Sequence, residues 1–334
     1  MSDVAQHAGV ALGTVSNALN HPERVTLAVR DRVMASISAL GFVPNRAARS
    51  LAVGRSNTVA FVLADLANSF FVDMARGAEQ EAANAGRFLV LANADVDQEK
   101  QLDYIRYFGE EQVEGILVAP LAGVLDFPPL DERTSAIVVL DADPDLRSAC
   151  SARPDNHLGG RIAAEHLLSS GRRRIAFVGG ATERSRAIRD RHDGAFAAIR
   201  DHGGATFAHF GSDDVRVADG RTIGRALLAL SEEEMPDGIV AAADLVAQGL
   251  LQSILRDGRY RFPDDIALIA CDDNRAASDS VIPISTVNLP GLELGQIGIQ
   301  LLLAELAAGP DHRHRQVTIS PDITARESSV GRAI

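Results

Sequence analysis

Two carboxylates stand where short apolar runs end: Asp141 closes the run AIVVLD, and Asp272 closes ALIACD. Such a pair could in principle serve as general acid and general base. The sequence has none of the patterns GxGxxG, GxxxxGK[ST], GxSxG or HExxH, which mark common nucleotide, hydrolase and metalloprotease sites. We therefore expect no catalytic residues.

The side chains that could bind a metal are scattered along the chain. Cys150 and Cys271 are far apart and have no CxxC partner or neighbouring His, so we interpret both as plain buried thiols. His312 and His314 flank Arg313 in a polar stretch, which favours a solvated connection. We expect no disulfide framework, no metal and no cofactor.

A repeating pattern must position the two carboxylates. After Ser56, short apolar runs such as TVAFVLAD alternate with amphipathic stretches such as FFVDMARGAEQEAANAG. This alternation predicts parallel strands covered by helices on both faces. Two blocks of it predict two similar subdomains, one at about 57–155 plus 286–320 and the other at about 156–285 plus 321–334.

Composition indicates a soluble protein of more than one domain. The chain has 334 residues, 46% apolar and 23% charged, without a run of about 18 uncharged apolar residues. The first residues, MSDVAQHAGV, have neither the basic region nor the apolar run of a secretory signal. We expect a cytoplasmic protein with no membrane segment.

The charge is divided unevenly. Residues 1–58 carry six Arg against two Asp and one Glu, which gives 6 − 3 = +3, so the remainder carries −12 − 3 = −15. A basic head on an acidic body is expected when only one module meets phosphate groups.

The first 44 residues have helical spacing. Gly9 and the cluster Asn20–Pro22 interrupt it, which predicts three short helices. We expect Asp3 with Gln6 to cap the first, and Thr26 to cap the third, which should end near Gly41. Residues 45–56 have helical composition but are too few to form a stable helix alone.

Several of these segments together resemble the lactose/galactose repressor (LacI/GalR) family of bacterial transcription regulators. The matching segments are DVAxxAGVxxxTVSxxLN at 3–20, VPNRAARSL at 43–51, DLANSFF at 65–71, DNHLGGRIAAEHL at 155–167, RRRIAFVGG at 172–180 and ITARES at 323–328. The resemblance implies an α/β protein: an all-α helix-turn-helix head at 1–44, a hinge helix at 45–56, and a sensor at 57–334 that is similar to periplasmic binding proteins. It also implies a repressor that binds a near-palindromic DNA operator as a homodimer and responds to a small polar effector, a sugar or sugar derivative.

The resemblance assigns DNA contacts to particular residues of the head. Base-reading positions correspond to Leu12, Gly13 and Asn17, phosphate-contacting positions to Thr14, Ser16 and Asn20, and further contacts to Asn45 and to Leu51, which would enter the minor groove. Ala11 stands where the family usually has a capping Ser. Gly13 has no side chain and Leu12 can read only apolar features, so we expect Asn17 to supply most base discrimination.

The resemblance also places the effector in a cleft at the carboxyl ends of the strands. The implied contacts are Asp65, Asn68, Phe70, Phe71, Asp141, Arg189, Arg191, Asp244, Asp272 and Asn288. Phe70 and Phe71 could instead be the buried start of a helix. Where sugar binders often have larger polar or aromatic side chains, Ala142, Val215 and Ala243 indicate a roomier site. The arginines could clamp an acidic group, which leaves an acidic sugar derivative open.

Two other classes of protein share this architecture. An α/β enzyme would need Asp141 and Asp272 as a preorganised pair, yet both belong to subdomain edges expected to move. A periplasmic-type sugar-binding protein would have no use for the head.

Overall fold

The computed structural model describes residues 1–42, 56–121, 135–141, 149–183 and 185–331. The chain divides into two compact units, Met1–Ser56 and Asn57–Ile334. Of the expected hinge, only Ser56 is among the described residues.

The first unit is a small bundle of three helices. These are α1 (Ser2–Ala8), α2 (Leu12–Asn20) and α3 (Leu27–Ala39), with a 3₁₀ turn, η1 (Pro22–Arg24), between the last two. Val4, Val15 and Val33 are fully buried and contribute one side chain from each helix to the core. The three predicted helices are therefore confirmed.

The helix ends differ in part from the prediction. The cap predicted at Asp3 and Gln6 is wrong, because α1 already includes both residues and Met1 precedes it. Thr26 does occupy the N-cap position of α3, but among the described residues its side chain makes no capping hydrogen bond. The predicted end of α3 is confirmed, because Gly41 follows it with a positive φ of 58°.

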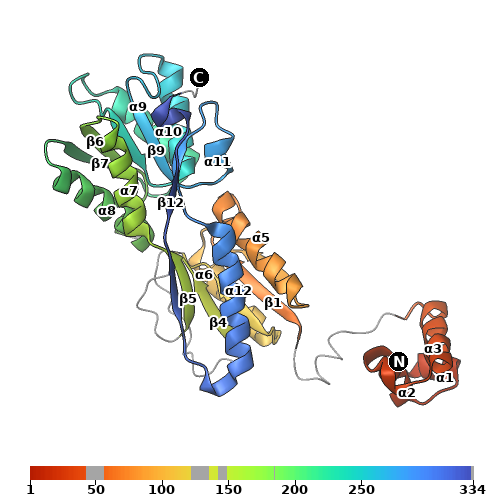
Figure 1. Ribbon diagram of the computed structural model, residues 1–334. Coiled ribbons are helices and arrows are strands. Elements are labelled where there is room, and N and C mark those ends of the chain that lie inside the picture. The colour runs from red at the N-terminus through yellow and green to blue at the C-terminus, as the bar shows by residue number, and fades with distance from the viewer. Residues whose placement is uncertain (43–55, 122–134, 142–148, 184, 332–334) are drawn as a thin grey trace. The chain divides into compact units, whose positions relative to one another are not determined.

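The second unit contains two six-stranded sheets (Figure 1). The first has the order β11-β5-β4-β3-β1-β2, and all its pairs are parallel. Its strands are β1 (Thr58–Leu63), β2 (Phe88–Asn93), β3 (Gly115–Val118), β4 (Ala136–Leu140), β5 (Cys150–Pro154) and β11 (Gln316–Ile319). Its helices are α5 (Ser69–Asn84), α6 (Gln98–Glu110) and α12 (Gly291–Ala308), followed by η3 (Gly309–Asp311).

The second sheet has the order β12-β10-β9-β8-β6-β7. Its strands are β6 (Arg174–Val178), β7 (Thr206–Phe210), β8 (Gly238–Ala241), β9 (Ala267–Asp272), β10 (Ser285–Asn288) and β12 (Asp322–Thr324). They are parallel except for β12, which runs antiparallel to β10. The helices are α7 (Asn156–Ser169), α8 (Arg186–His202), α9 (Val217–Leu228), α10 (Asp244–Asp257), α11 (Arg275–Ser278) and α13 (Glu327–Val330).

The chain passes between the two sheets three times. The passages follow β5, β10 and β11, because β6–β10 and β12 belong to the second sheet and all other strands to the first. The second passage lies after Asn288, slightly later than the expected boundary at residue 286.

Three helix pairs are in close contact through glycines: α5 with α12, α7 with α8, and α9 with α10. In each pair both helices contribute a glycine at which an added Cβ would overlap the backbone of the facing helix; these are Gly77 and Gly295, Gly160 and Gly194, and Gly220 and Gly249. The helix backbones can approach this closely only because these positions lack a Cβ.

Helix α12 is long and apolar enough to cross a membrane by length and composition alone. In this structure, however, Leu294, Ile299 and Leu302 are fully buried, and the helix packs on α5 and β4. A core helix passes the same test, and α12 has the contacts of one.

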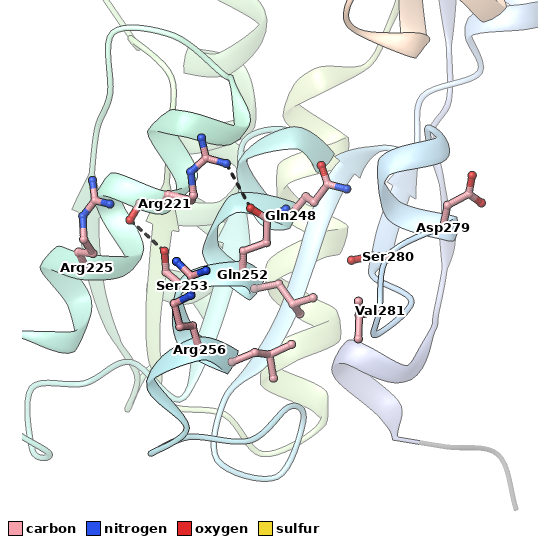
Figure 2. A pocket seen from close by; sticks show the side chains of 11 residues that line it. Arg221, Arg225, Gln248, Gln252, Ser253, Arg256, Asp279, Ser280 and Val281 are labelled. Atoms are coloured by element: carbon pink, nitrogen blue, oxygen red, sulfur yellow. Dashed lines mark hydrogen bonds between the residues drawn. The ribbon is translucent and has the colours of Figure 1, made fainter.

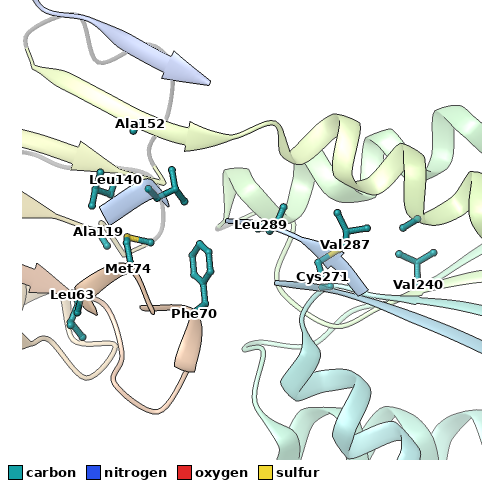
Figure 3. Close-up of a cluster of buried hydrophobic side chains, with 14 of the residues drawn as sticks. Leu63, Phe70, Met74, Ala119, Leu140, Ala152, Val240, Cys271, Val287 and Leu289 are labelled. Atoms are coloured by element: carbon teal, nitrogen blue, oxygen red, sulfur yellow. The ribbon is translucent and has the colours of Figure 1, made fainter. Parts of the chain in front are cut away.

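One core cluster includes residues of both sheets. Figure 3 shows part of this cluster. Phe70 and Met74 of α5 lie near each other on the side of the first sheet, whereas Val287 of β10 and Leu289, which follows it, come from the second. Both cysteines are buried, as predicted. The interpretation of Cys150 as a plain thiol without a neighbouring His is wrong, because its Sγ lies 3.1 Å from His312 Nε2. The side chain of His312 is only 9% exposed, so the predicted solvated connection is wrong at this residue as well.

Candidate functional site

The face of α2 that carries the predicted base-reading residues points away from the core. Leu12 is 49% exposed, and Gly13 and Asn20 are exposed as well. Val15 and Ala18 lie on the opposite face and are buried. A helix anchored on one side and exposed on the other can enter a DNA groove without losing its core.

The remaining DNA-contact candidates of α2 are half-buried: Thr14, Ser16 and Asn17. Asn20 Nδ2 donates to Ser16 Oγ at 3.3 Å, so these two side chains are already oriented together. Gly9, in the turn before α2, has φ 63° and ψ 39°, the left-handed conformation predicted for the tight turn.

Ala11 precedes α2 in an extended conformation, φ −69° and ψ 152°, where a Ser would cap the helix. An alanine side chain has no acceptor, so the first N–H groups of α2 need water or a phosphate oxygen. Asn45 and Leu51 lie outside the described residues. Three Arg balance two Asp and one Glu over residues 1–42. The +3 of residues 1–58 therefore comes from the Arg at positions 46, 49 and 55, which belong to the expected hinge and also lie outside the described residues.

Arg191 is the centre of a polar cluster in the sensor. Its guanidinium is buried and donates three hydrogen bonds, from Nε to Asn156 Oδ1 at 2.8 Å, from Nη1 to the carbonyl of Ala242 at 2.6 Å and from Nη1 to Asp272 Oδ1 at 3.2 Å. Asp272, equally buried, ends β9. Burial raises the pKa of Asp272 to about 6, with Arg191 acting to lower it and Asp141 to raise it.

Asp141, which follows the end of β4, is the contribution of the first sheet to this cluster. Its backbone has φ 54°, and its N–H donates to the carbonyl of Ala152 at 2.8 Å. Burial raises its pKa, while Arg191 and a hydrogen bond from Asn156 act to lower it. Among the described residues, its buried Oδ1 has no hydrogen-bond partner. A buried acceptor left open in this way is a place for a ligand donor.

Asp244 has a different role, because protein groups occupy its carboxylate. Oδ2 accepts from the backbone N–H of Asn274 at 2.7 Å, and Oδ1 accepts from Thr286 Oγ1 at 2.8 Å. Burial, and then the charge of Asp272, raises its pKa well above its usual value. Asp244 therefore positions the loop after β9 rather than offering a free acceptor.

Asn68 links the two sheets beside this cluster. Its Oδ1 accepts from the backbone N–H of Phe70, which caps α5, and from Asn274 Nδ2 at 3.1 Å. A second link comes from the backbone N–H of Arg275, which donates to Ser69 Oγ at 3.3 Å. These bonds join the loop after β1 to the loop after β9.

The structure thus brings together Asn68, Asp141, Arg191, Asp244 and Asp272. Asn288 belongs near them, since it pairs with Asp272 in the register of β9 and β10. Sequence reasoning missed Asn156 and Asn274, although both follow strand ends and the same strand-end rule could have found them.

The other effector candidates are placed differently. Phe70 is 4% exposed and belongs to the core, and Phe71 meets its edge at 5.5 Å between ring centres. Asp65 accepts from the backbone N–H of Ala67 at 2.8 Å and so closes a local turn. Arg189 is exposed, two residues from buried Arg191 on the same helix and therefore on another face.

A separate hollow of about 700 Å³ lies beside α9, α10 and α11 (Figure 2). Exposed Arg221, Arg225 and Arg256 line it, and Arg221 Nη1 donates to Gln252 Oε1 at 3.2 Å. Selective pockets for small ligands hold them with buried polar groups. The cluster around Arg191 has such groups, whereas these three arginines are exposed.

A helix-turn-helix head together with a two-sheet sensor that surrounds a buried polar cluster defines a ligand-controlled DNA-binding regulator. Comparison with known families agrees with this class. "Bacterial regulatory proteins, lacI family" matches residues 1–45, and "Periplasmic binding protein-like domain" matches residues 164–329. The chain is 30% identical to the ribose operon repressor of Bacillus subtilis (strain 168) over 311 residues, which cover 93% of this chain and 92% of the relative. The chain therefore belongs to the lacI family of bacterial regulatory proteins, and the predicted family is confirmed.

Solved structures show the same fold. A transcriptional regulator of this family from Silicibacter pomeroyi superposes with a TM-score of 0.82 at 24% identity, covering 99% of both chains. The lac repressor dimer bound to operator and the anti-inducer ONPF gives 0.83 at 22% identity, covering 98% of both chains. The predicted α/β fold with a helix-turn-helix head is thereby confirmed.

Proposed function

We propose that this protein represses transcription by placing α2 in the major groove of each half of a near-palindromic operator, and that a neutral polyhydroxylated metabolite in the Arg191 cluster controls its binding. The observation that carries the effector site is the open, buried Oδ1 of Asp141 beside Arg191 and Asp272. We also propose that the head comprises residues 1–44, the hinge 45–56 and the sensor 57–334.

The charges of the cluster favour a neutral ligand over an acidic one. Three aspartates, Asp141, Asp244 and Asp272, surround one arginine, and that arginine already donates to three protein acceptors. An anionic ligand would meet carboxylates, whereas hydroxyl groups can donate to those of Asp141 and Asp272. Exposed Arg189 lies on another face, so the two-arginine clamp is not supported. The relative's name, ribose operon repressor, fits a sugar effector.

The same arrangement supports a binding protein rather than an enzyme. Asp141 and Asp272 come from different sheets, and Asp272 is held by Arg191 in an ion pair. A general acid and base must keep a fixed separation, but these two would separate whenever the sheets move apart. We propose that the effector leaves unchanged and that the protein acts in the cytoplasm, where its operator is found.

The effector assignment can be tested by thermal shift, because a ligand that binds only the folded state raises the Tm. Neutral monosaccharides and disaccharides, sugar acids and sugar phosphates should be screened against the full chain. We expect a neutral sugar to raise the Tm, and Asp141→Asn to abolish the rise while operator affinity stays unchanged. Asp103→Asn, at an exposed surface pair with Arg106, is the matched control. A rise produced only by acidic compounds would refute the proposed ligand class.

We propose that the homodimer forms through an edge of the first sheet. Strand β2 forms an edge of that sheet, and Phe88, Val90 and Leu91 on it are 52%, 42% and 47% exposed. An edge strand with large apolar side chains invites another chain unless it is covered. Leu91→Asp should shift the protein towards monomer in light scattering and weaken binding to the full operator. An unchanged dimer would exclude β2 from the interface.

The hinge couples the two halves in this proposal. An isolated segment as short as 45–56 is a marginal helix, so pairing with a partner hinge on DNA would stabilise it. An effector shifts the DNA-bound population only if it favours one orientation of the subdomains. Leu51→Ala should weaken operator binding and leave effector affinity of the DNA-free protein unchanged. Equal operator affinity would remove Leu51 from the contact.

A further inference from the structure

Four side chains with metal-binding atoms meet at the first sheet, outside the effector cluster. Cys150 begins β5, Glu305 lies near the end of α12, and His312 and His314 lie between η3 and β11. Their ligand atoms are all within 4.8 Å of one another. We propose that these four residues bind one Zn²⁺ ion.

The distances between the donor atoms fit a tetrahedral zinc site. Cys150 Sγ lies 3.1 Å from His312 Nε2 and 3.9 Å from His314 Nδ1, and Glu305 Oε2 lies 3.8 Å and 3.7 Å from the same nitrogens. Zinc bonds of about 2.0–2.3 Å at tetrahedral angles place neighbouring donor atoms about 3.4–3.6 Å apart. These four distances differ from that range by a few tenths of an ångström. The donor atoms of the whole set lie within 4.8 Å of one another, so the most widely spaced atoms would have to move closer by about 1 Å when the ion binds.

The types of donor select the metal. One thiolate, two imidazoles and one carboxylate suit zinc, whereas Mg²⁺ and Ca²⁺ require oxygen ligands. The donor atoms are also available. The buried Oε2 of Glu305 has no hydrogen-bond partner among the described residues. The backbone N–H of Arg315 donates to Cys150 Sγ at 3.4 Å, the kind of outer contact that orients a ligand sulfur.

Strand pairing explains how residues so far apart in sequence come together. Strand β11 pairs in parallel with β5, in the register Gln316 with Ser151, and Ser151 N–H donates to the carbonyl of Arg315. The residues just before β11 therefore lie beside the start of β5. His312 and His314 are two residues apart in this connection, so an extended backbone turns both side chains to one side.

The proposed zinc site lies at the amino ends of the strands of the first sheet, whereas the effector cluster lies at their carboxyl ends. Cys150 is at the amino end of β5, whereas Asp141 and Asn156 follow the carboxyl ends of β4 and β5. Strand β1 begins at the same end of the sheet. It is three strands from β5, so the two strands are about 14 Å apart at the usual strand spacing. A bound ion would tie β5 to the connection from α12, independently of the effector.

The site can be tested with the full chain, free of any purification tag and stripped of metal by a chelator. Zinc content should reach one ion per chain after dialysis. Cobalt, as a coloured probe, should give the visible bands of a tetrahedral ion and a near-ultraviolet thiolate-to-cobalt band. Cys150→Ser should remove the thiolate band, and His312→Ala with His314→Ala should remove tetrahedral binding. Cys271→Ala and His202→Ala, a buried thiol and an exposed imidazole elsewhere, should keep both signals.

Folding of the variants is controlled by circular dichroism and by the Tm without metal. Zinc should raise the Tm of the wild type and of the two control variants, and should not raise that of Cys150→Ser. Wild-type protein that gives no thiolate-to-cobalt band would refute the proposal. Retention of one zinc per chain by the folded variant carrying Cys150→Ser, His312→Ala and His314→Ala would refute it as well.

Discussion

The buried carboxylate of Asp272 should make the stability of the sensor depend on pH in an unusual direction. Its pKa is raised from 3.8 to about 6 in the folded protein, mainly by burial. A raised pKa means that the folded state binds the proton more tightly than the unfolded state. The resulting stabilisation is complete below pH 3.8 and is lost as the pH rises through 6.

The size of the effect follows from the shift. A change of about 2 pKa units corresponds to about 3 kcal/mol, of which about 2 kcal/mol is lost between pH 4 and pH 7. Asp272→Asn removes this titration but leaves the guanidinium of Arg191 in place. We therefore expect the unfolding free energy of Asp272→Asn, relative to wild type, to rise by about 2 kcal/mol over this pH range.

Urea unfolding of the full chain at several pH values measures this difference. The protein has no tryptophan, and its three tyrosines, Tyr104, Tyr107 and Tyr260, all belong to the second unit, so tyrosine fluorescence reports on the sensor alone. Asp103→Asn, at an exposed surface pair with Arg106, is the control and should run parallel to wild type. If Asp272→Asn also ran parallel to wild type, the reasoning about burial would be refuted.

Three further predictions concern the head, the cluster and the helix contacts. Asn17→Ala should weaken discrimination at one position of each half-site by about 1–3 kcal/mol, measured by binding to a set of single-base operator variants; an unchanged preference would exclude Asn17 from base reading. Arg191→Ala should lower the unfolding free energy by about 3–5 kcal/mol at pH 7, because it leaves Asp272 buried without its partner. A loss of less than about 1 kcal/mol in urea unfolding would show that the buried ion pair does not stabilise the protein. Gly295→Ala should destabilise the sensor by about 1–3 kcal/mol or more, because the Cβ of the new alanine would overlap the carbonyl of Met74. Gly109→Ala, where an added Cβ meets nothing within 4 Å, is its control and should be neutral or stabilising in the same assay.

The elements and the general place of the cluster could be predicted from sequence because both follow from local patterns. Alternating apolar runs define strands, and this pattern places Asp141 and Asp272 at the carboxyl ends of their strands. Because β4 and β9 belong to different sheets, the proximity of the two carboxylates follows from the cleft that the family resemblance implies. The Arg191 position came from the family resemblance. Its exact partners, Asn156 and the carbonyl of Ala242, depend on how α7 and α8 pack and have no local signal.

Other features could not be predicted because they depend on long-range pairing. Cys150 and His312 are separated by 162 residues, and only the addition of β11 beside β5 brings them together. The three residues of antiparallel β12 are too few to show a period. Phe70 has the same aromatic side chain whether it stacks on a ligand or fills the core, and only its 4% exposure shows that it is in the core.

The glycine contacts between α5 and α12, α7 and α8, and α9 and α10 have a consequence for how force is transmitted through the sensor. Sliding of packed helices requires side chains that can exchange one set of rotamers for another. At the glycine positions of these crossings, backbone lies against backbone, so few rotamers can change there and sliding of the paired helices is resisted. Each sheet and its helices should then rotate as a rigid body. Bending should occur mainly at the three passages of the chain between the two sheets. A closure of small amplitude at Arg191 would reach the far edges of both sheets without being absorbed on the way.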